Sequence, residues 1–317
     1  MKIWLIVAIV LVVTGSLLFV GIMTFYQWDF TRLSTVKFET NEFVADRNFS
    51  NISINTDTAD VVFLPSADNI CRVFCNEKGN EKHSVSIEND TLIIHRNDQR
   101  KWYEYIGISF GTPKITVYLS RGQYYALSIQ ESTGDIDIPV DLKFESMDIR
   151  VTTGNVTNHA YTSGTINIKA DTGDIFVKNI HADSMNLNVT TGKITAENII
   201  CEEDIQIAVT TGKTQLHNII CKNIFSTGNT GDITLEHVVA KDFLSAKRTT
   251  GSIRLNSCDA AKLYIKTTTG DVTGSLLTGK IFVTHTSTGD VDIPPTTIGG
   301  TCEIYTTTGD IKMTLGS

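Results

Sequence analysis

The residues best suited to chemistry in this sequence are aspartates that follow a glycine at regular intervals. Carboxylate oxygens are preferred ligands of hard cations such as Ca²⁺, so carboxylates stacked on consecutive turns of a repeat would be candidate metal ligands: Asp271, Asp290 and Asp310. Aspartate also favours turns because its side chain bonds to nearby backbone. Lys193 and Lys213 occupy the same position in other copies, which favours the turn interpretation. The sequence therefore predicts no metal and no cofactor, with these three aspartates as weak candidates.

Cysteine is the second residue type with chemical potential, and the chain contains six, none of them in a CxxC pair. Cys71 and Cys75 lie four residues apart on an expected strand, too far apart for a disulfide. Cys201 and Cys221 occupy matching positions of neighbouring repeats, where a disulfide is geometrically allowed. Alanines fill the same position in other repeats, which favours two small buried thiols. A thiol nucleophile needs a base, and the sequence pattern places no histidine to act as one.

An aromatic and basic segment is the most distinctive candidate for a binding surface. Residues 97–111 interrupt the alternating pattern around them, so we expect a protruding loop. Its candidate contact residues are Arg100, Lys101, Trp102, Tyr103 and Tyr105.

A repeat of nineteen or twenty residues must position all of these side chains. Its mark is a Thr-Gly turn followed by a polar and then a β-branched residue. One coil of a solenoid per repeat explains the even spacing better than independent hairpins do. Glycine suits each corner because it adopts positive φ at no steric cost. The corner glycines are Gly134, Gly154, Gly173, Gly192, Gly212, Gly231, Gly251, Gly270, Gly289 and Gly309.

Apolar and polar residues alternate on both sides of each corner. In one repeat Ile166 and Ile168 face inward while Asn167 and Lys169 face outward, which is the period of a strand with one buried face. The predicted fold is all-β: a parallel β-solenoid of 19–20 residue coils, preceded by one transmembrane helix.

Three regions follow from these patterns. Residues 131–317 are expected to form about ten coils, and residues 31–130 a less regular β-rich cap. Because the chain stops part way through a coil, its last strand is expected to leave an open edge. A second copy of the chain could pair with that edge.

Residues 1–30 are predicted to form a transmembrane anchor. No charged side chain occurs from Ile3 to Gln27, and a helix of that length crosses a hydrocarbon core of about 30 Å. Trp4 and Trp28 would lie at the two interfaces. A cleaved signal peptide is the alternative, but its apolar core is normally shorter, and no small-x-small cleavage site follows here.

Charged residues beside the apolar segment bear on its orientation. Lys2 and the amino terminus favour a cytoplasmic N-terminus, whereas Arg32 and Lys37 weaken this bias. The expected location is the cell membrane, with a single pass and an extracytoplasmic C-terminal domain.

Composition excludes two classes of protein. A hydrophobic content of 41% with 20% charged residues is typical of a folded chain rather than a disordered one. The formal net charge of -8 repels nucleic acid, and no basic stripe offsets it.

Several motifs together resemble a known family. The apolar N-terminal segment, the stretch TADVVFLPSADN, the strand KITVYLS and the serial TTGD corners are similar to the bacterial putative adhesin family of β-strand-repeat proteins, a domain of unknown function. The resemblance covers residues 36–315. It implies a cell-envelope location and a role in adhesion, envelope stress or surface assembly, and it supplies no catalytic residues.

These observations predict a non-enzymatic surface-binding or scaffold protein of the cell envelope, with an envelope glycan or protein as its partner. A self-assembling scaffold and an envelope-stress sensor are the alternatives. A β-helix enzyme acting on glycans is disfavoured, because such enzymes have longer coils and a cleft lined with carboxylates.

Overall fold

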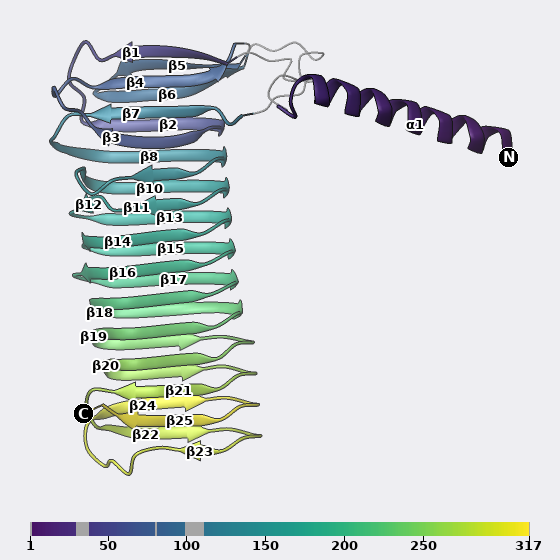
Figure 1. Cartoon of the computed structure of the whole chain (residues 1–317). Helices are drawn as coiled ribbons and strands as arrows, with labels where there is room; N and C mark the ends of the chain where they lie inside the picture. The colour runs from purple at the N-terminus through teal and green to yellow at the C-terminus, as the bar shows by residue number, and fades with distance from the viewer. Residues whose placement is uncertain (1, 30–37, 80, 99–110, 317) are drawn as a thin grey trace.

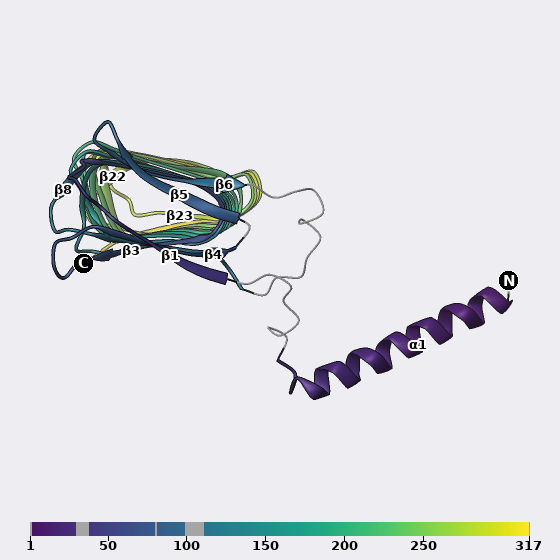
Figure 2. The same ribbon diagram turned by 90° about the horizontal axis from the view of Figure 1, so that it is seen from above.

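The computed structural model describes residues 2–29, 38–79, 81–98 and 111–316. They form one helix and a long rod of stacked strands (Figure 1). Viewed along its axis, the rod is a flattened tube with two long faces (Figure 2). The predicted fold class, a parallel β-solenoid preceded by one apolar helix, is confirmed.

Helix α1 (Lys2–Phe25) is apolar around its whole circumference. Its Ile3–Phe25 segment has a mean hydropathy of 2.9, and none of it is buried against the rest of the protein. The helix is therefore long and apolar enough to cross a membrane, although a signal sequence would share both properties.

Each long face of the rod is a ladder of strands joined by backbone hydrogen bonds. From the N-terminal end, the first face runs through β1 (Phe38–Val44), β4 (Arg72–Lys78), β7 (Lys114–Leu119), β3 (Asp60–Pro65), β9 (Ile136–Ile138), β11 (Val156–Asn158), β14 (Ile175–Ala182), β16 (Ile194–Cys201), the first parts of β18 (Thr214–Thr230), β19 (Ile233–Lys247) and β20 (Ile253–Lys266), then β21 (Val272–Leu276), β25 (Ile311–Leu315) and β23 (Val291–Asp292).

The second face is built in the same way. It runs through β5 (Glu81–Glu88), β6 (Thr91–Asp98), β2 (Asn51–Thr58), β8 (Gln123–Thr133), β10 (Lys143–Thr153) with the short β12 (Tyr161–Thr162), β13 (Thr165–Thr172), β15 (Ser184–Thr191), β17 (Asp204–Thr211), the second parts of β18, β19 and β20, then β24 (Gly300–Tyr305) and β22 (Lys280–His285).

Pairing along both faces is parallel, except for three antiparallel pairs at the N-terminal end: β1–β4, β4–β7 and β5–β6. The parallel register places equivalent residues of successive coils side by side, as with Ile168, Leu187 and Ile207. Inward positions carry Ile, Leu, Val and Phe, and they merge into one apolar core along the whole rod. Outward positions are mostly polar, so each face is buried on one side only.

The corner glycines permit the close stacking of coils. Gly154 has φ 149° and Gly212 has φ 139°, a backbone region that side chains disfavour. A Cβ added to Gly212 would lie 1.7 Å from the carbonyl oxygen of Gly192 on the previous coil. Glycine is therefore required twice over, by its backbone conformation and by the approach of the next coil.

The stacking order at the C-terminal end differs from the order of the sequence. Strand β25 lies between β21 and β23, and strand β24 lies between β20 and β22. The final residues of the chain thus fill a gap between two earlier coils. The expectation that the last strand leaves the open edge is wrong, because β22 and β23 form that edge and the chain's end is paired on both sides.

The edge coil is itself protected against further pairing. Strand β23 contains only two residues and is followed closely by Pro294 and Pro295, which cannot donate a backbone hydrogen bond. The chain after β23 passes across the open end of the tube (Figure 2). Lys280, which is 4% exposed, lies 2.6 Å from Asp259 and ties the edge coil to the body of the rod. These features disfavour assembly of copies end to end.

Replacing a corner glycine should destabilise the rod strongly. We expect Gly212→Ala to lower the free energy of unfolding by about 3 kcal/mol, because alanine disfavours the required φ and its Cβ overlaps a backbone oxygen. Gly122→Ala is the control, since a Cβ there meets nothing within 4 Å. Denaturant unfolding measures both, and equal stability of the two variants would contradict this role of the corner.

Deleting residues 298–317 should release the edge coil. Strands β22 and β23 pair only with β24 and β25 among the described residues, so we expect their amides to lose protection in hydrogen exchange. Amides of β13–β17, in the middle of the rod, provide the internal control. Retained protection of β22 would show that it can pair directly with β20, contrary to the observed order.

Candidate functional site

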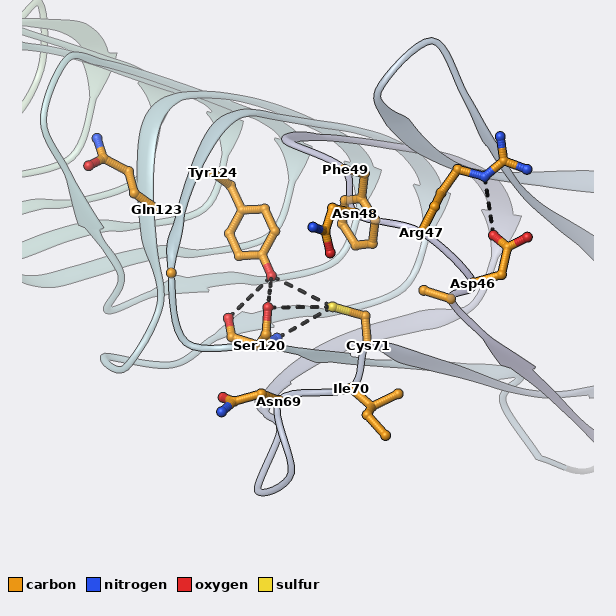
Figure 3. Close-up of a pocket in the computed structure, with 12 residues that line it drawn as sticks. Asp46, Arg47, Asn48, Phe49, Asn69, Ile70, Cys71, Ser120, Gln123 and Tyr124 are labelled. Carbon is orange, nitrogen blue, oxygen red and sulfur yellow. Dashed lines mark hydrogen bonds and ion pairs between the residues drawn. The ribbon is translucent and has the colours of Figure 1, made fainter.

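The most enclosed hollow at the N-terminal end of the rod lies among three loops (Figure 3). Its volume is about 420 Å³. The lining comes from residues 45–49, 69–71, 120 and 122–124, and we call this hollow the cap pocket.

A charged turn holds one of these loops in place. Asp68 accepts hydrogen bonds from the Ile70 N–H at 3.1 Å and from the guanidinium of Arg72 at 2.9 and 2.5 Å. The bonds from Arg72 hold the pKa of the Asp68 carboxyl well below its usual range. The loop therefore keeps its shape with a charged carboxylate at neutral pH.

Aromatic rings form the floor of the cap pocket. Tyr124 lies between Phe49 and Phe144, with 5.8 Å between ring centroids on each side. Its hydroxyl donates to the Ser120 carbonyl oxygen at 3.2 Å and lies 3.0 Å from the Ser120 hydroxyl. Burial raises the pKa of Tyr124, so the phenol stays neutral. This stack continues the apolar core up to the wall of the pocket.

Cys71 is the one half-buried cysteine, and its thiol faces the cap pocket. It accepts a hydrogen bond from the Ser120 N–H at 3.5 Å and lies 3.8 Å from the Tyr124 hydroxyl. None of these neighbours takes up a proton at neutral pH. The pocket's one carboxylate, Asp46, pairs instead with Arg47 at 3.2 Å. The pocket thus lacks the base that a thiol nucleophile needs.

The remaining polar groups suit binding rather than reaction. Asn48, Asn69 and Gln123 line the rim of the cap pocket, and each amide offers both donors and an acceptor. Their side chains can be followed around the pocket in Figure 3. The arrangement can hold a neutral ligand rich in hydroxyl groups.

A buried polar cluster lies in the same region, between β2, β4 and β5. The Thr56 hydroxyl is 2.8 Å from Nε2 of His83, and Nδ1 of His83 is 2.7 Å from the carboxylate of Glu77. This is the order of a nucleophile, a base and an orienting acid. Thr56 is only 3% exposed and Glu77 only 1%, so a substrate cannot reach them.

Sequence reasoning missed this cluster. It placed no histidine beside a thiol, yet ligand atoms of His83 and Cys75 lie within 4.8 Å of each other. Alternation along β4 does place Cys75 and Glu77 on one side of the strand, which was the only local signal. His83 comes from another strand, and only the fold brings it there.

Glu131 is a second buried acid, next to Thr56 across two paired strands. It is 2% exposed, and one carboxyl oxygen accepts from the Ala59 N–H at 3.3 Å while the other has no hydrogen-bond partner among the described residues. Burial raises the pKa of Glu131 to about 8. The carboxyl is therefore mostly protonated at neutral pH.

The three aspartates considered as cation ligands act as hydrogen-bond acceptors. Asp271 accepts from the backbone N–H of Asp310, and Asp310 accepts from that of Asp290, both at 2.9 Å. They do lie on neighbouring coils, but in the order 271, 310, 290. Each carboxylate thus bonds to the corner of the next coil, rather than to its own backbone, and the turn interpretation needs no metal.

Other candidate residues from the sequence lie elsewhere. Arg100, Lys101, Trp102, Tyr103 and Tyr105 fall outside the described residues. Cys201 and Cys221 are buried free thiols in a column of small side chains.

Comparison with known proteins agrees with this geometry. The Toastrack DUF4097 family model matches residues 49–219 and 199–317. The chain belongs to the Toastrack DUF4097 family. The resemblance to β-strand-repeat proteins of unknown function is thereby confirmed. A comparison with curated protein sequences found no match.

Solved structures similar to this Toastrack chain share its fold at low identity. A putative lipid binding protein from Parabacteroides distasonis is 17% identical, with a TM-score of 0.50, over 76% of this chain and 98% of that one. A putative adhesin from the same species is 12% identical, with a TM-score of 0.48, over 86% and 98%. A putative adhesin from Parabacteroides merdae is 13% identical, with a TM-score of 0.47, over 77% and 98%. At these identities the likeness concerns the fold alone.

The buried Glu131 should make stability depend on pH. Its pKa is higher in the folded chain than the value near 4.3 expected in the unfolded one, so its contribution is full below about pH 4.3 and is lost as pH rises towards 8. Across this range each pH unit should lower the free energy of unfolding by about 1.4 kcal/mol. Glu131→Gln keeps the shape of the neutral acid, so we expect it to be more stable than the wild type at pH 8.5.

Glu145→Gln provides the control, because Glu145 is exposed. Thermal unfolding from pH 4.5 to pH 8.5 measures all three proteins. If Glu131→Gln and the wild type changed in parallel across this range, burial of the charged carboxylate would not be costly.

Proposed function

We propose that the chain is a membrane-anchored extracytoplasmic protein of the cell envelope, which binds an envelope glycan and catalyses no reaction. The observation that carries the proposal is helix α1, whose Ile3–Phe25 segment is apolar and packs against nothing in the protein. A helix of this kind is stable in a bilayer and would aggregate in water. Anchored there, the rod would hold its cap and its two polar faces in the envelope.

The cap pocket supports a glycan as the ligand. Amides of Asn48, Asn69 and Gln123 alternate donors with acceptors, which matches the hydroxyl groups of sugars. Asp46 and Arg47 neutralise each other, so the pocket favours neither a strong anion nor a cation. The long apolar tail of a lipid would find mostly polar residues here.

The outer surface of the second face offers the same chemistry along the rod. A shallow hollow of about 570 Å³ is lined by side chains that include Asn186, Asn188, Gln206 and Phe225. The rings of Phe225 and Phe243 lie 5.7 Å apart on this surface. Amides beside exposed aromatic rings, repeated at a strand spacing of about 4.8 Å, suit an extended chain of sugars.

The absence of catalysis is supported by both candidate centres. In the cap pocket, Cys71 has no base beside it among the described residues. In the buried cluster, Thr56 has a base but is closed to solvent. Neither centre combines access with an activated nucleophile.

Two amides at the rim provide the test. We expect the double variant Asn48→Ala/Gln123→Ala to bind solubilised peptidoglycan strands about tenfold more weakly than the wild type, because two hydrogen bonds of about 1 kcal/mol each are lost. Calorimetry with the detergent-solubilised chain measures the affinities. Gln215→Ala is the matched control, since Gln215 is an exposed amide outside the cap pocket. Equal affinity of both variants, or no glycan binding by the wild type, would contradict the proposal.

A further inference from the structure

The buried cluster in the cap region has the composition of a metal site. Cys75, Glu77 and His83 each offer one ligand atom, and these three atoms lie within 4.8 Å of one another. A thiolate sulfur, an imidazole nitrogen and a carboxylate oxygen are ligands that Zn²⁺ binds in proteins. We propose that these three residues bind a zinc ion, at a site separate from the cap pocket and independent of glycan binding.

The two strands that supply the ligands hold them in a converging arrangement. Cys75 and Glu77 are two residues apart on β4, so their side chains point to the same side of the strand, and both are buried in the core. His83 comes from β5 and turns Nδ1 towards Glu77, at 2.7 Å from Oε2. A tetrahedral ion needs ligand atoms a few ångströms apart, so small side-chain shifts would suffice to admit zinc.

Outer contacts orient two of the ligands. Nε2 of His83 lies 2.8 Å from the Thr56 hydroxyl, which leaves Nδ1 as the nitrogen that faces the cluster. Oε1 of Glu77 accepts a hydrogen bond from the Asn41 amide at 2.7 Å, which leaves Oε2 facing the same way. Metal-binding histidines and carboxylates in proteins are commonly fixed by such second contacts.

Charge at the cluster favours a divalent cation. Glu77 is 1% exposed, and among the described residues its one ion-pair partner is His83; no lysine or arginine lies within ion-pair distance of it. Cys75 is 3% exposed, and its sulfur has no hydrogen-bond partner among the described residues. One Zn²⁺ would balance the carboxylate and a thiolate, leaving no net charge buried.

Binding can be written with atoms and charges in balance. The Cys75 S–H bond breaks, its proton leaves to solvent and a sulfur–zinc bond forms. His83 stays neutral, binding through Nδ1 with its proton on Nε2, from which it donates to Thr56. One proton is released for each ion bound, so affinity should fall about tenfold for each unit that the pH is lowered.

Such an ion would connect the antiparallel strands of the cap to the first regular coil. Cys75 and Glu77 belong to β4, His83 to β5, and its partner Thr56 to β2, which pairs directly with β8 of the solenoid. Zinc should therefore stabilise the N-terminal end of the rod, where the parallel ladder stops.

Cobalt provides a spectroscopic probe of the site. The full chain is purified in detergent with a chelator, the chelator is removed, and Co²⁺ is added both to the folded protein and during refolding. We expect a thiolate-to-cobalt charge-transfer band that saturates at one ion per chain and disappears when Zn²⁺ is added. Cys71→Ser should keep the band and Cys75→Ser should lose it, because Cys71 lies outside the cluster.

Alkylation of the wild type gives a measurement that needs no variant. Bound Zn²⁺ should protect Cys75 from a thiol reagent during partial unfolding, as read by mass spectrometry, while Cys258 gains no protection. If neither addition nor refolding gives a thiolate–cobalt band, or if Zn²⁺ does not protect Cys75, the proposal is wrong. A band that survives Cys75→Ser would likewise overturn it.

Discussion

The close stacking of one coil on the next at the glycine corner is the constraint on which the rest of the structure depends. At Gly212 the carbonyl oxygen of the preceding coil occupies the place where a Cβ would be. This contact fixes the distance between coils, brings successive strands into register and aligns the apolar residues inside the tube. Aspartates beside the glycines reinforce the stack, because each carboxylate accepts a hydrogen bond from the next corner, as Asp271 does from Asp310.

A rod built in this way has its chemistry outside and at its ends. Inward positions of the coils are filled by packed apolar side chains, so the regular part of the tube holds a core and not a binding cavity. Departures from the repeat occur in the cap, where antiparallel strands and loops replace coils. The cap pocket, the buried Glu131 and the cluster around His83 all lie there, which is why we place ligand and metal binding in that region.

The repeat made much of the fold predictable, while contacts between distant segments were not. Even spacing from Gly134 to Gly309 was enough to predict the coils, their parallel order and the inward rows. The insertion of β25 between β21 and β23 leaves no local trace, because both neighbours satisfy the same pattern of alternation. His83 escaped prediction for a related reason: its partners Thr56 and Glu77 lie on strands joined to it only by the fold. The loops of the cap pocket are likewise distant in sequence.

Labelling of an exposed cysteine in living cells tests the central claim, that the rod stands outside the membrane on an uncleaved helix. Lys169→Cys places a thiol on the outer side of β13, where Lys169 is exposed, whereas five of the six native cysteines are buried. The account predicts that a membrane-impermeant maleimide labels this variant in intact cells, and that the labelled chain stays in the membrane fraction with its N-terminal segment present. Labelling only after lysis, or release of a shortened chain into the medium, would contradict it.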